Sequence, residues 1–410
     1  MHYVLIGNSI ASTGCIEGIR KHDVQAQITV IGDESYHCYA RPLISYLLQE
    51  KTTVEKMAYR CEEFYEKHKV RILSNSKVST IDPTKKELSL ADGSKVGYDK
   101  LLIATGSSAF IPPMKHLEKV KNQFTFMTLA DAEALNEALT KNSKVLIIGA
   151  GLIGLKCAEG ILKKVKSIEV VDLANRILPS ILDEEGSNRV QAHLEEEGIT
   201  FHLQDSVAQF EEGKAFLASQ KVLDFDLLVI AVGVKPNVEL AKSAGIEVER
   251  GILIDHHCRT SCADVYAAGD CAQGWELTTQ TRRMLPLLGN AFMQGECAGS
   301  NMAGVETRLE KSIAMNAIGF LGLHVITAGI CEGEDTIIQS KTGYKRLFVQ
   351  DDYLVGYILV GDMVDRAGIY TSLIRERTPL SSLDFSLITE QPALMAFAQQ
   401  VRKQQLGRAQ

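Results

Sequence analysis

The sequence lacks the cysteine spacings that are typical of metal and dithiol sites. Nine cysteines are scattered through 410 residues, and no two of them are separated by two residues. This absence excludes a C-x-x-C signature for zinc, an iron–sulfur cluster or a redox dithiol, so we predict no metal site. Cys258 and Cys262 are four residues apart with no second pair or histidine cluster, and packing explains them best. The odd count favours reduced thiols in a cytoplasm.

An export signal and a convincing membrane span are also missing. Residues 1–4 lead into an expected strand without a basic region or a long apolar core, so no signal peptide is predicted. The most apolar stretch, residues 312–331, contains Asn316, His324 and three glycines. It therefore predicts buried strands and turns rather than a span.

The charge balance limits the classes of partner that we expect. The formal net charge is −7, with 23% charged and 45% hydrophobic residues, which is typical of a soluble globular protein. An acidic chain is not expected to bind nucleic acid nonspecifically. A local basic patch could still bind an acidic protein partner. The length allows two or three domains.

The most informative feature that is present is a complete glycine motif. The apolar run at residues 145–148 leads into Gly149-Ala150-Gly151-Leu152-Ile153-Gly154, and a helical stretch follows. Glycines leave backbone N–H groups open to a pyrophosphate, and the helix N-terminus adds partial positive charge. Asp172 closes the next expected strand, where a carboxylate binds both ribose hydroxyls and repels a 2′-phosphate. NADH is therefore favoured over NADPH, although Arg176 could soften this preference.

A second turn at the N-terminus departs from the full motif. The strand at residues 3–6 leads into Gly7-Asn8-Ser9-Ile10-Ala11-Ser12, so serines replace the second and third glycines. Both serines are small; the Ser9 hydroxyl could bind a phosphate, and Ser12 still permits close helix–strand packing. Asp33 and Glu34 follow the next strand, at the distance where a Rossmann unit binds a ribose. Asp270, after Gly269, either binds the ribityl hydroxyls of a flavin or caps the segment that follows.

The order of elements occurs twice. Each copy consists of a strand, a glycine turn, an acidic residue, a hairpin and a buried strand. The first copy ends at Thr105-Gly106 and the second at Val232-Gly233. Residues 36–70, within the first copy, are expected to be largely helical. Residues 311–410 have no glycine motif and alternate strands (345–349, 354–359) with a helix (367–375). This pattern predicts an α/β protein with two Rossmann-like domains and a C-terminal α+β domain.

Together these motifs resemble the FAD-dependent pyridine nucleotide–disulfide oxidoreductase superfamily over residues 1 to about 305. The segment Tyr39-Ala40-Arg41-Pro42-Leu43-Ile44-Ser45 and the tail at 354–362 resemble NADH:rubredoxin reductases and the flavin domains of nitrite reductases. The resemblance implies a glutathione-reductase-like fold. Its FAD-binding domain would comprise residues 1–110 and 238–308, its NAD-binding domain residues 111–237, and its C-terminal interface domain residues 309–410.

The resemblance also implies the site residues. Arg41 and Pro42 would lie beside the flavin ring, with Lys51 as a weaker catalytic candidate, because a cation there could stabilise reduced flavin. The residues implied to bind FAD or NADH are Gly7, Ser9, Ala11, Ser12, Asp33, Glu34, Arg41, Pro42, Ala104, Thr105, Gly106, Gly149, Gly151, Leu152, Ile153, Gly154, Asp172, Gly233, Gly269 and Asp270.

The implied activity is electron transfer from NADH through flavin to a small redox protein, either rubredoxin or a ferredoxin-like iron–sulfur protein. Two alternatives stay open. One is a single-cysteine coenzyme A disulfide reductase or NADH oxidase, and the other is a flavoprotein subunit of a larger complex. In single-cysteine relatives, that cysteine lies three residues before a proline. Counted back from Pro42, this position is Tyr39, and Cys38 lies one residue before it. The oligomeric state, a homodimer or a subunit of a complex, is also open.

Overall fold

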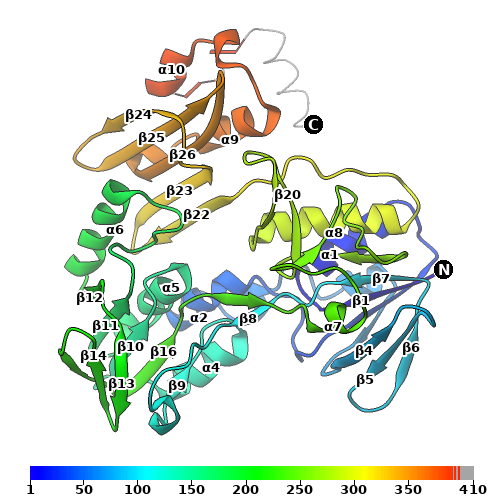
Figure 1. Cartoon of the computed structure of the whole chain (residues 1–410), viewed down its shortest axis with the longest axis horizontal. Helices are drawn as coiled ribbons and strands as arrows, with labels where there is room; N and C mark the ends of the chain where they lie inside the picture. Colours follow the sequence, from blue (N-terminus) through cyan, green and yellow to red (C-terminus); the bar gives the residue numbers. More distant parts are fainter. Residues whose placement is uncertain (391, 394–395, 398–410) are drawn as a thin grey trace. The chain divides into compact units, whose positions relative to one another are not determined.

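The computed structural model describes residues 1–390, 392–393 and 396–397 (Figure 1). The chain divides into two compact units. The first comprises Met1–Asn175, Gly198–Trp275 and Arg282–Glu310, and the second comprises Arg176–Glu197, Glu276–Thr281 and Lys311–Gln410. No helix in the described part of the chain is long and apolar enough to cross a membrane.

The first unit contains two five-stranded parallel sheets. The N-terminal sheet has the order β19-β7-β1-β2-β3. Its inner strands β7, β1 and β2 are rich in Val, Ile and Leu and are buried on both faces, as expected for a parallel sheet. Because parallel strands end at one edge, the turns after β1, β7 and β19 meet there. The bounds are β1 (His2–Ile6), β2 (Gln27–Ile31), β3 (Val70–Leu73), β7 (Lys100–Ile103) and β19 (Val265–Ala267).

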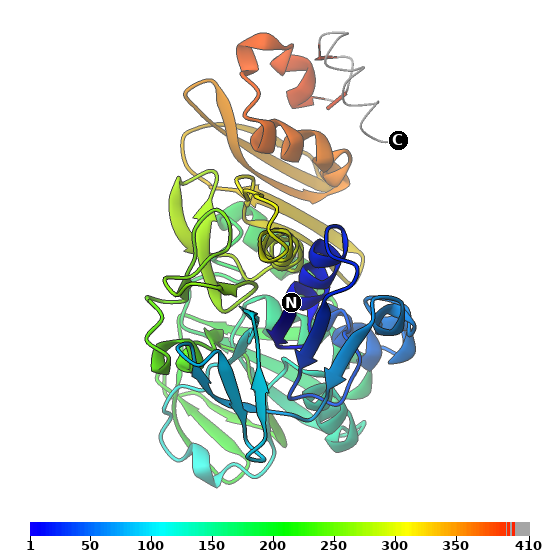
Figure 2. The ribbon, with the colours of Figure 1, turned by 90° about the vertical axis from the view of Figure 1, so that its right-hand side faces the viewer.

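Two helices on this sheet are in backbone contact. α1 (Ile10–Arg20) and α8 (Leu288–Met302) lie side by side in both views (Figure 1, Figure 2). A Cβ added at Gly295 would overlap the carbonyl oxygen of Ala11, and one at Gly299 would overlap that of Cys15. The small residues of α8 are therefore required by the closeness of the two helices. This contact fixes the start of α1 against α8.

The second parallel sheet repeats the design with the order β12-β11-β10-β16-β9. α5 (Leu152–Ile161) follows β10, and α4 (Leu129–Ala138) begins with a capping box formed by Thr128 and Asp131. The predicted duplication of architecture is thus confirmed. The bounds are β9 (Gln123–Phe124), β10 (Lys144–Ile148), β11 (Ser167–Asp172), β12 (Ile199–Leu203) and β16 (Leu227–Ile230).

Short sheets, mostly antiparallel, complete the first unit. The predicted Asp92-Gly93 hairpin is present, with Gly93 at φ +87. The ribbon of β8 (Ser107–Ala109) and β17 (Val234–Pro236) joins the two halves of the unit. The others are β4 (Val78–Asp82) with β5 (Glu87–Leu90) and β6 (Lys95–Gly97), β13 (Val207–Glu211) with β14 (Lys214–Leu217) and β15 (Val222–Asp224), and β18 (Ile252–Leu253) with β20 (Ala272–Glu276) and β21 (Thr281–Met284).

The second unit is built on an antiparallel sheet with the order β22-β23-β26-β25-β24. α9 (Ala367–Glu376) packs on it through a core that includes Leu347, Tyr357 and Tyr370. The apolar stretch at 312–331 forms strands and a turn, as predicted. α6 (Glu184–Glu196) belongs to this unit; its N-cap Asp183 pairs with Arg346 at 2.8 Å. The bounds are β22 (Met315–Phe320), β23 (Leu323–Gly329), β24 (Glu334–Gln339), β25 (Gly343–Gln350), β26 (Tyr353–Gly361) and α10 (Phe385–Glu390).

Two sequence expectations need correction. Residues 36–70 are mostly not helical and contain only the short segments η1 (Arg41–Leu43), α2 (Ile44–Leu48), η2 (Glu55–Met57) and α3 (Phe64–Lys67). Tertiary contacts override the local pattern, since the Tyr39 hydroxyl accepts from Leu129 N at 2.9 Å. The second concerns Asp270, which caps no following helix because the strand β20 comes next.

Candidate functional site

The N-terminal glycine turn lies at the carboxyl edge of the first sheet. Gly7 has φ +109, and a Cβ there would overlap the carbonyl oxygen of Ala104 at the end of β7. Only glycine satisfies both conditions. The Ser12 hydroxyl donates to Gly7 O at 2.6 Å. Ser12 therefore fixes the turn by a hydrogen bond where the full motif has a third glycine.

The start of α1 is suited to an anion. Ser9 is the N-cap residue, but in the described structure its side chain caps no backbone N–H, and the first turn carries no acidic residue. The first N–H groups of a helix have no partner within the helix, so they can bind a phosphate. Ala11 is small and buried, and a Cβ at Gly269 would lie 3.3 Å from its Cβ. The turn after β19 is thus close to the start of α1.

Asp270 and Arg41 converge beside these turns. The Ser107 hydroxyl donates to Asp270 Oδ2 at 2.9 Å. Burial raises the pKa of Asp270, while the hydrogen bond from Ser107 and the nearby Arg41 guanidinium oppose this shift. Arg41 forms an ion pair with Glu34 and donates to Met127 O at 3.4 Å. The segment after β2 and the end of β19, far apart in sequence, therefore meet at one site.

Thr105 and Gly106 anchor the crossing between the two halves of the unit. Asn237 Nδ2 donates to Thr105 O at 2.8 Å, and Thr105 Oγ1 donates to Asn237 O at 2.7 Å. Asn237 N also donates to Gly106 O at 2.9 Å. Asn237 is not among the residues predicted to bind FAD or NADH. It lies just after β17, and its role is structural because it holds the two crossing strands together.

The second glycine turn is complete and open. Gly149 has φ +111, and a Cβ there would overlap the carbonyl oxygen of Ala231. A Cβ at Gly154 would overlap Gly149 O, so the helix and strand are in direct contact. At Gly151, the N-cap residue of α5, a Cβ would meet nothing within 4 Å. The protein itself does not need glycine there, and the open space fits a bound pyrophosphate.

Asp172 ties this turn to the end of β11. Its Oδ2 accepts from Ala150 N at 2.6 Å, and its Oδ1 accepts from Ala174 N at 2.7 Å. Each carboxylate oxygen retains a lone pair that can accept from a ribose hydroxyl. Arg176, which could have softened the preference for NADH, donates through Nε to Leu182 O at 3.4 Å. Gly233, at φ +128, accepts a backbone hydrogen bond from Phe110 N.

Cys38, the thiol of the single-cysteine alternative, and Lys51, the weaker catalytic candidate, lie in different surroundings. Cys38 is buried, and the Thr13 hydroxyl lies 3.4 Å from its sulfur. Burial raises the pKa of Cys38 to about 11, so the thiol is protonated near neutral pH. Lys51 is exposed beyond the end of α2, with Nζ 5.8 Å from the Tyr46 ring centroid. None of the contacts among the described residues joins it to Arg41, so its catalytic role stays a prediction.

Sequence reasoning missed a buried ion pair on the glycine helix. Glu159 is 5% exposed and pairs with Lys156 one turn earlier. Lys156 Nζ lies 4.8 Å from the centroid of Tyr46 on α2, and a Cβ at Gly160 would lie 3.2 Å from Ser45 O. A charged residue inside an otherwise apolar helix face was the available signal. α2, which follows the Arg-Pro segment, therefore packs directly on α5, so the two glycine turns belong to one packed structure.

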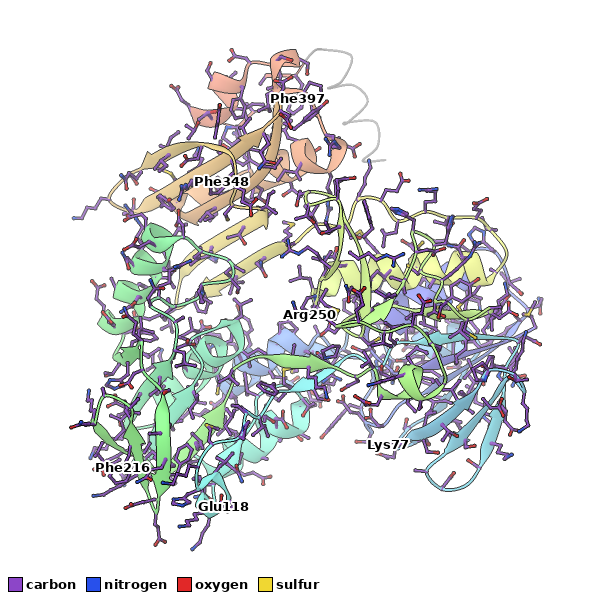
Figure 3. The ribbon with its side chains drawn as sticks, in the orientation of Figure 1. Lys77, Glu118, Phe216, Arg250, Phe348 and Phe397 are labelled. Carbon is purple, nitrogen blue, oxygen red and sulfur yellow. The ribbon has the colours of Figure 1, made fainter. Side chains whose placement is uncertain are left out.

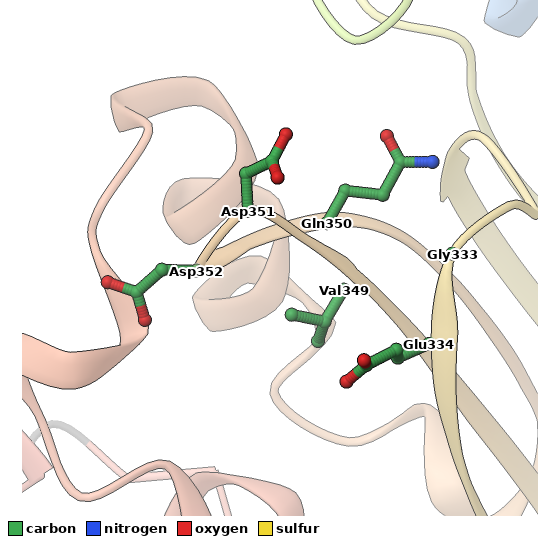
Figure 4. A pocket seen from close by; sticks show the side chains of 6 residues that line it. All are labelled: Gly333, Glu334, Val349, Gln350, Asp351 and Asp352. Carbon is green, nitrogen blue, oxygen red and sulfur yellow. The ribbon is translucent and has the colours of Figure 1, made fainter.

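A hollow in the second unit is a weaker candidate. It is lined by Gly333, Glu334, Val349, Gln350, Asp351 and Asp352 (Figure 4). The Asp352 carboxylate is already used, since it accepts from Ser381 N at 2.9 Å and from the Ser381 hydroxyl at 2.6 Å. Among the residues that the structure describes, no group of three His, Cys, Asp or Glu side chains could hold a metal ion. The hollow offers neither an anion-binding turn nor a cation, so no function is assigned to it.

Comparisons with known proteins agree with this geometry. The chain is 30% identical over 394 residues to the epsilon subunit of NADH-dependent phenylglyoxylate dehydrogenase from Aromatoleum evansii, covering 93% of each chain. It is 33% identical over 386 residues to the assimilatory nitrate reductase electron transfer subunit of Bacillus subtilis, with 91% of this chain covered. The chain spans only 49%, about half, of that relative's length.

The structural comparison gives the same fold. Putidaredoxin reductase, solved in a covalent complex with putidaredoxin, matches with a TM-score of 0.88 at 24% identity, covering 96% of this chain and 97% of that one. The family model described as pyridine nucleotide-disulphide oxidoreductase matches residues 1–295. Both Rossmann-like sheets lie within that range. The chain belongs to the pyridine nucleotide-disulphide oxidoreductase family.

Proposed function

We propose that this chain is an FAD-dependent NADH:acceptor oxidoreductase that passes electrons from NADH to a small redox protein, a rubredoxin or a ferredoxin-like iron–sulfur protein. One observation carries the proposal: two anion-binding glycine turns lie in one unit, joined by the contact between α2 and α5. A chain with two dinucleotide sites in one packed unit is suited to transfer between dinucleotides.

The first site fits FAD. The Gly7 turn and the uncapped start of α1 would bind the pyrophosphate, with Ser9 as an additional donor. Ser12 and Ala11 would keep the backbone close. The turn after β2 carries Asp33, which is exposed and could bind a ribose. Residues 104–106 and Asp270, at the ends of β7 and β19, would line the ribityl and ring portions.

The second site fits NADH. Gly149, Gly151 and Gly154 would hold the pyrophosphate at the start of α5, where Leu152 and Ile153 supply the first N–H groups. Asp172 would bind the ribose hydroxyls of NADH and repel the phosphate of NADPH. When bound, FAD would accept a hydride from NADH and release electrons singly.

Arg41 would supply positive charge near the flavin ring. The Glu34 ion pair holds its guanidinium, and Pro42, the second residue of η1, restricts the backbone next to it. In this arrangement Glu34 acts on Arg41 rather than on a ribose. Arg41 and Pro42 are thus the proposed residues beside the ring, and Lys51 is a secondary candidate.

The domain limits and cellular location belong to the same proposal. Residues 1–110 and 238–308 would form the FAD domain, residues 111–237 the NAD domain and residues 309–410 the C-terminal domain. β8 and β17 support the proposed boundaries, since their ribbon links the two Rossmann-like halves near residues 107 and 236. We place the protein in the cytoplasm, in keeping with nine cysteines without a disulfide among the described residues.

The flavoprotein-subunit alternative has specific support. The epsilon subunit from Aromatoleum evansii matches over 93% of its length, which is what a dedicated electron-transfer subunit would give. The single-cysteine alternative has less support, since the raised pKa of Cys38 and its burial disfavour a reactive thiolate. A Cys38→Ser variant that retains wild-type NADH-to-dye turnover would exclude it, whereas loss of turnover would restore it.

The direct test is anaerobic. The purified protein is reduced with NADH, mixed with rubredoxin or ferredoxin, and followed by the absorbance of the flavin and the iron centre. The proposal predicts rapid reoxidation by at least one of these acceptors. A flavin that NADH reduces but neither protein reoxidises would favour the subunit alternative. A protein that binds no flavin would refute the proposal.

A further inference from the structure

Three exposed arginines lie around one edge strand of the first unit. Arg282 and Arg283 are on β21, the outer strand of the sheet β18-β20-β21. Arg250 (labelled in Figure 3) precedes Gly251, where an added Cβ would overlap Met284 Sδ on the same strand. No ion pair involves any of the three among residues 1–390, 392–393 and 396–397.

The local charge is opposite to that of the whole chain. Two carboxylates lie near this strand. Glu249 Oε2 accepts from Gln273 Nε2 at 2.9 Å, and the buried Glu276, at the end of β20, accepts from the hydroxyls of Thr278 and Thr279. The three exposed arginines therefore outnumber these two carboxylates, in a protein with a net charge of −7. Charged residues also protect edge strands against aggregation, which is the structural alternative for Arg282 and Arg283.

The strand lies next to the proposed flavin site. β20, its neighbour in the sheet, begins two residues after Asp270. The chain after β21 leads into α8, where Gln294 Oε1 accepts from Gly269 N at 2.8 Å. The segment before β21 therefore begins at the Gly269-Asp270 turn, and the helix after β21 contacts this turn. A redox protein bound at this edge would be close to the flavin.

A second basic surface is less suitable. Lys163 and Lys166 are exposed after the end of α5, and Lys141 Nζ donates to Lys163 O at 2.6 Å. The ten residues of α5 separate this cluster from the Gly151 turn by about 15 Å. The arginine strand, in contrast, pairs with β20, which starts two residues after Asp270, so the arginine surface is the better position for an acceptor.

We propose that Arg250, Arg282 and Arg283 form the docking surface for an acidic iron–sulfur acceptor protein. The inference rests on the proposed function and names the surface through which it operates. Guanidinium groups bind carboxylates with two parallel hydrogen bonds, and complementary charge raises association rates at low salt. Binding here would bring the acceptor to the Asp270 edge without occupying the NADH site.

The test uses the full-length holoprotein, with NADH as donor and an acidic rubredoxin or an acidic ferredoxin as acceptor. The Arg282→Glu/Arg283→Glu variant should lose about 10-fold or more in kcat/KM for the protein acceptor at low salt, with a weaker dependence on ionic strength. Its reduction of the neutral acceptor menadione should be unchanged. Lys163→Glu/Lys166→Glu makes the same charge change on the lysine surface and should leave both rates unchanged.

Each outcome separates the surface from the function. Wild-type protein that reduces neither menadione nor an iron–sulfur protein would refute the proposed function. Normal reduction of the acidic acceptor by the arginine variant, or a loss in the lysine variant instead, would refute the docking surface. Reduction of menadione but of neither acidic protein would refute it too. Trp275 on β20 is the only tryptophan, so its fluorescence gives an independent measure of acceptor binding.

Discussion

The two glycine turns hold their helices against their sheets in different ways. In the first, the Ser12 hydroxyl donates to the carbonyl of Gly7. In the second, the helix lies so close that any side chain at Gly154 would overlap Gly149 O. The difference shows that the third glycine of the motif is required only where the backbone approach leaves no room. A serine can replace it where its hydroxyl reaches the turn.

The acids of the two turns also differ. Asp172 is held by Ala150 N and Ala174 N and closes its turn. In the first half, Glu34 is taken up by Arg41, and Asp270 reaches the site from a distant strand and is partly buried. The NAD half is therefore organised by neighbouring segments, whereas the flavin half is assembled from segments far apart in sequence.

Gly151→Leu should have the largest functional effect. A leucine side chain would fill the open space at the start of α5 while meeting no protein atom near its Cβ. We expect reduction of bound flavin by NADH to fall by at least about 100-fold, with flavin content unchanged. Stopped-flow reduction measures the rate, and dithionite reduction confirms that the flavin remains active. Normal NADH reduction would show that the second turn is not the NADH site.

Substitutions at the third glycine position of each turn test the difference in packing between the two turns. Gly154→Ser should lower the free energy of unfolding by about 3 kcal/mol, because its Cβ would overlap Gly149 O. Ser12→Ala, which loses one hydrogen bond, should cost about 1 kcal/mol. Urea denaturation monitored by fluorescence gives both values. Equal costs would contradict the different packing of the two turns.

Asp172→Ala should change the choice of nucleotide. The variant loses the ribose acceptor and the charge that repels a 2′-phosphate, so NADH should bind about 10-fold more weakly and the gap to NADPH should narrow. KM values for both nucleotides provide the measurement. Asp172→Glu, which keeps the charge, is the control. A wild-type preference for NADPH would show that the interpretation of Asp172 is wrong.

Asp270→Asn should have the smallest effect on stability. Its effect on FAD binding can be measured separately. Burial raises the pKa of Asp270, so the folded apoprotein binds its proton more tightly than the unfolded chain does. Stability of the wild-type apoprotein should therefore fall as the pH rises from the unfolded to the folded pKa. The variant should lack this loss while binding FAD more weakly. Thermal unfolding of both apoproteins between pH 4 and pH 7 tests the sign.

Much of this fold follows from local sequence patterns. Short apolar runs such as residues 145–148 and 226–231 became the central strands of the second sheet, because a parallel sheet buries both faces. The start of α4 is also local in origin, since Thr128 and Asp131, three residues apart, form its capping box. Residues 36–70 could not be predicted, since their conformation depends on contacts such as that of Tyr39 with Leu129 N.

The candidate site likewise has residues that the sequence predicts and contacts that it does not. The glycine turns and Asp172 lie within continuous motifs and could be found from spacing. The approach of Ser107 and Arg41 to Asp270 depends on tertiary structure, as does the Lys156–Glu159 pair against Tyr46. A local sequence pattern gives no information on how close two distant segments lie in space, so these contacts are known only from the structure.

The central claim is that one chain holds two dinucleotides and passes a hydride between them without a cysteine. Anaerobic titration of the Cys38→Ser holoprotein with NADH tests it most directly. The account predicts a flavin that one equivalent of NADH reduces fully, at the wild-type rate. A flavin that NADH no longer reduces in this variant, or a protein that binds no flavin, would contradict it.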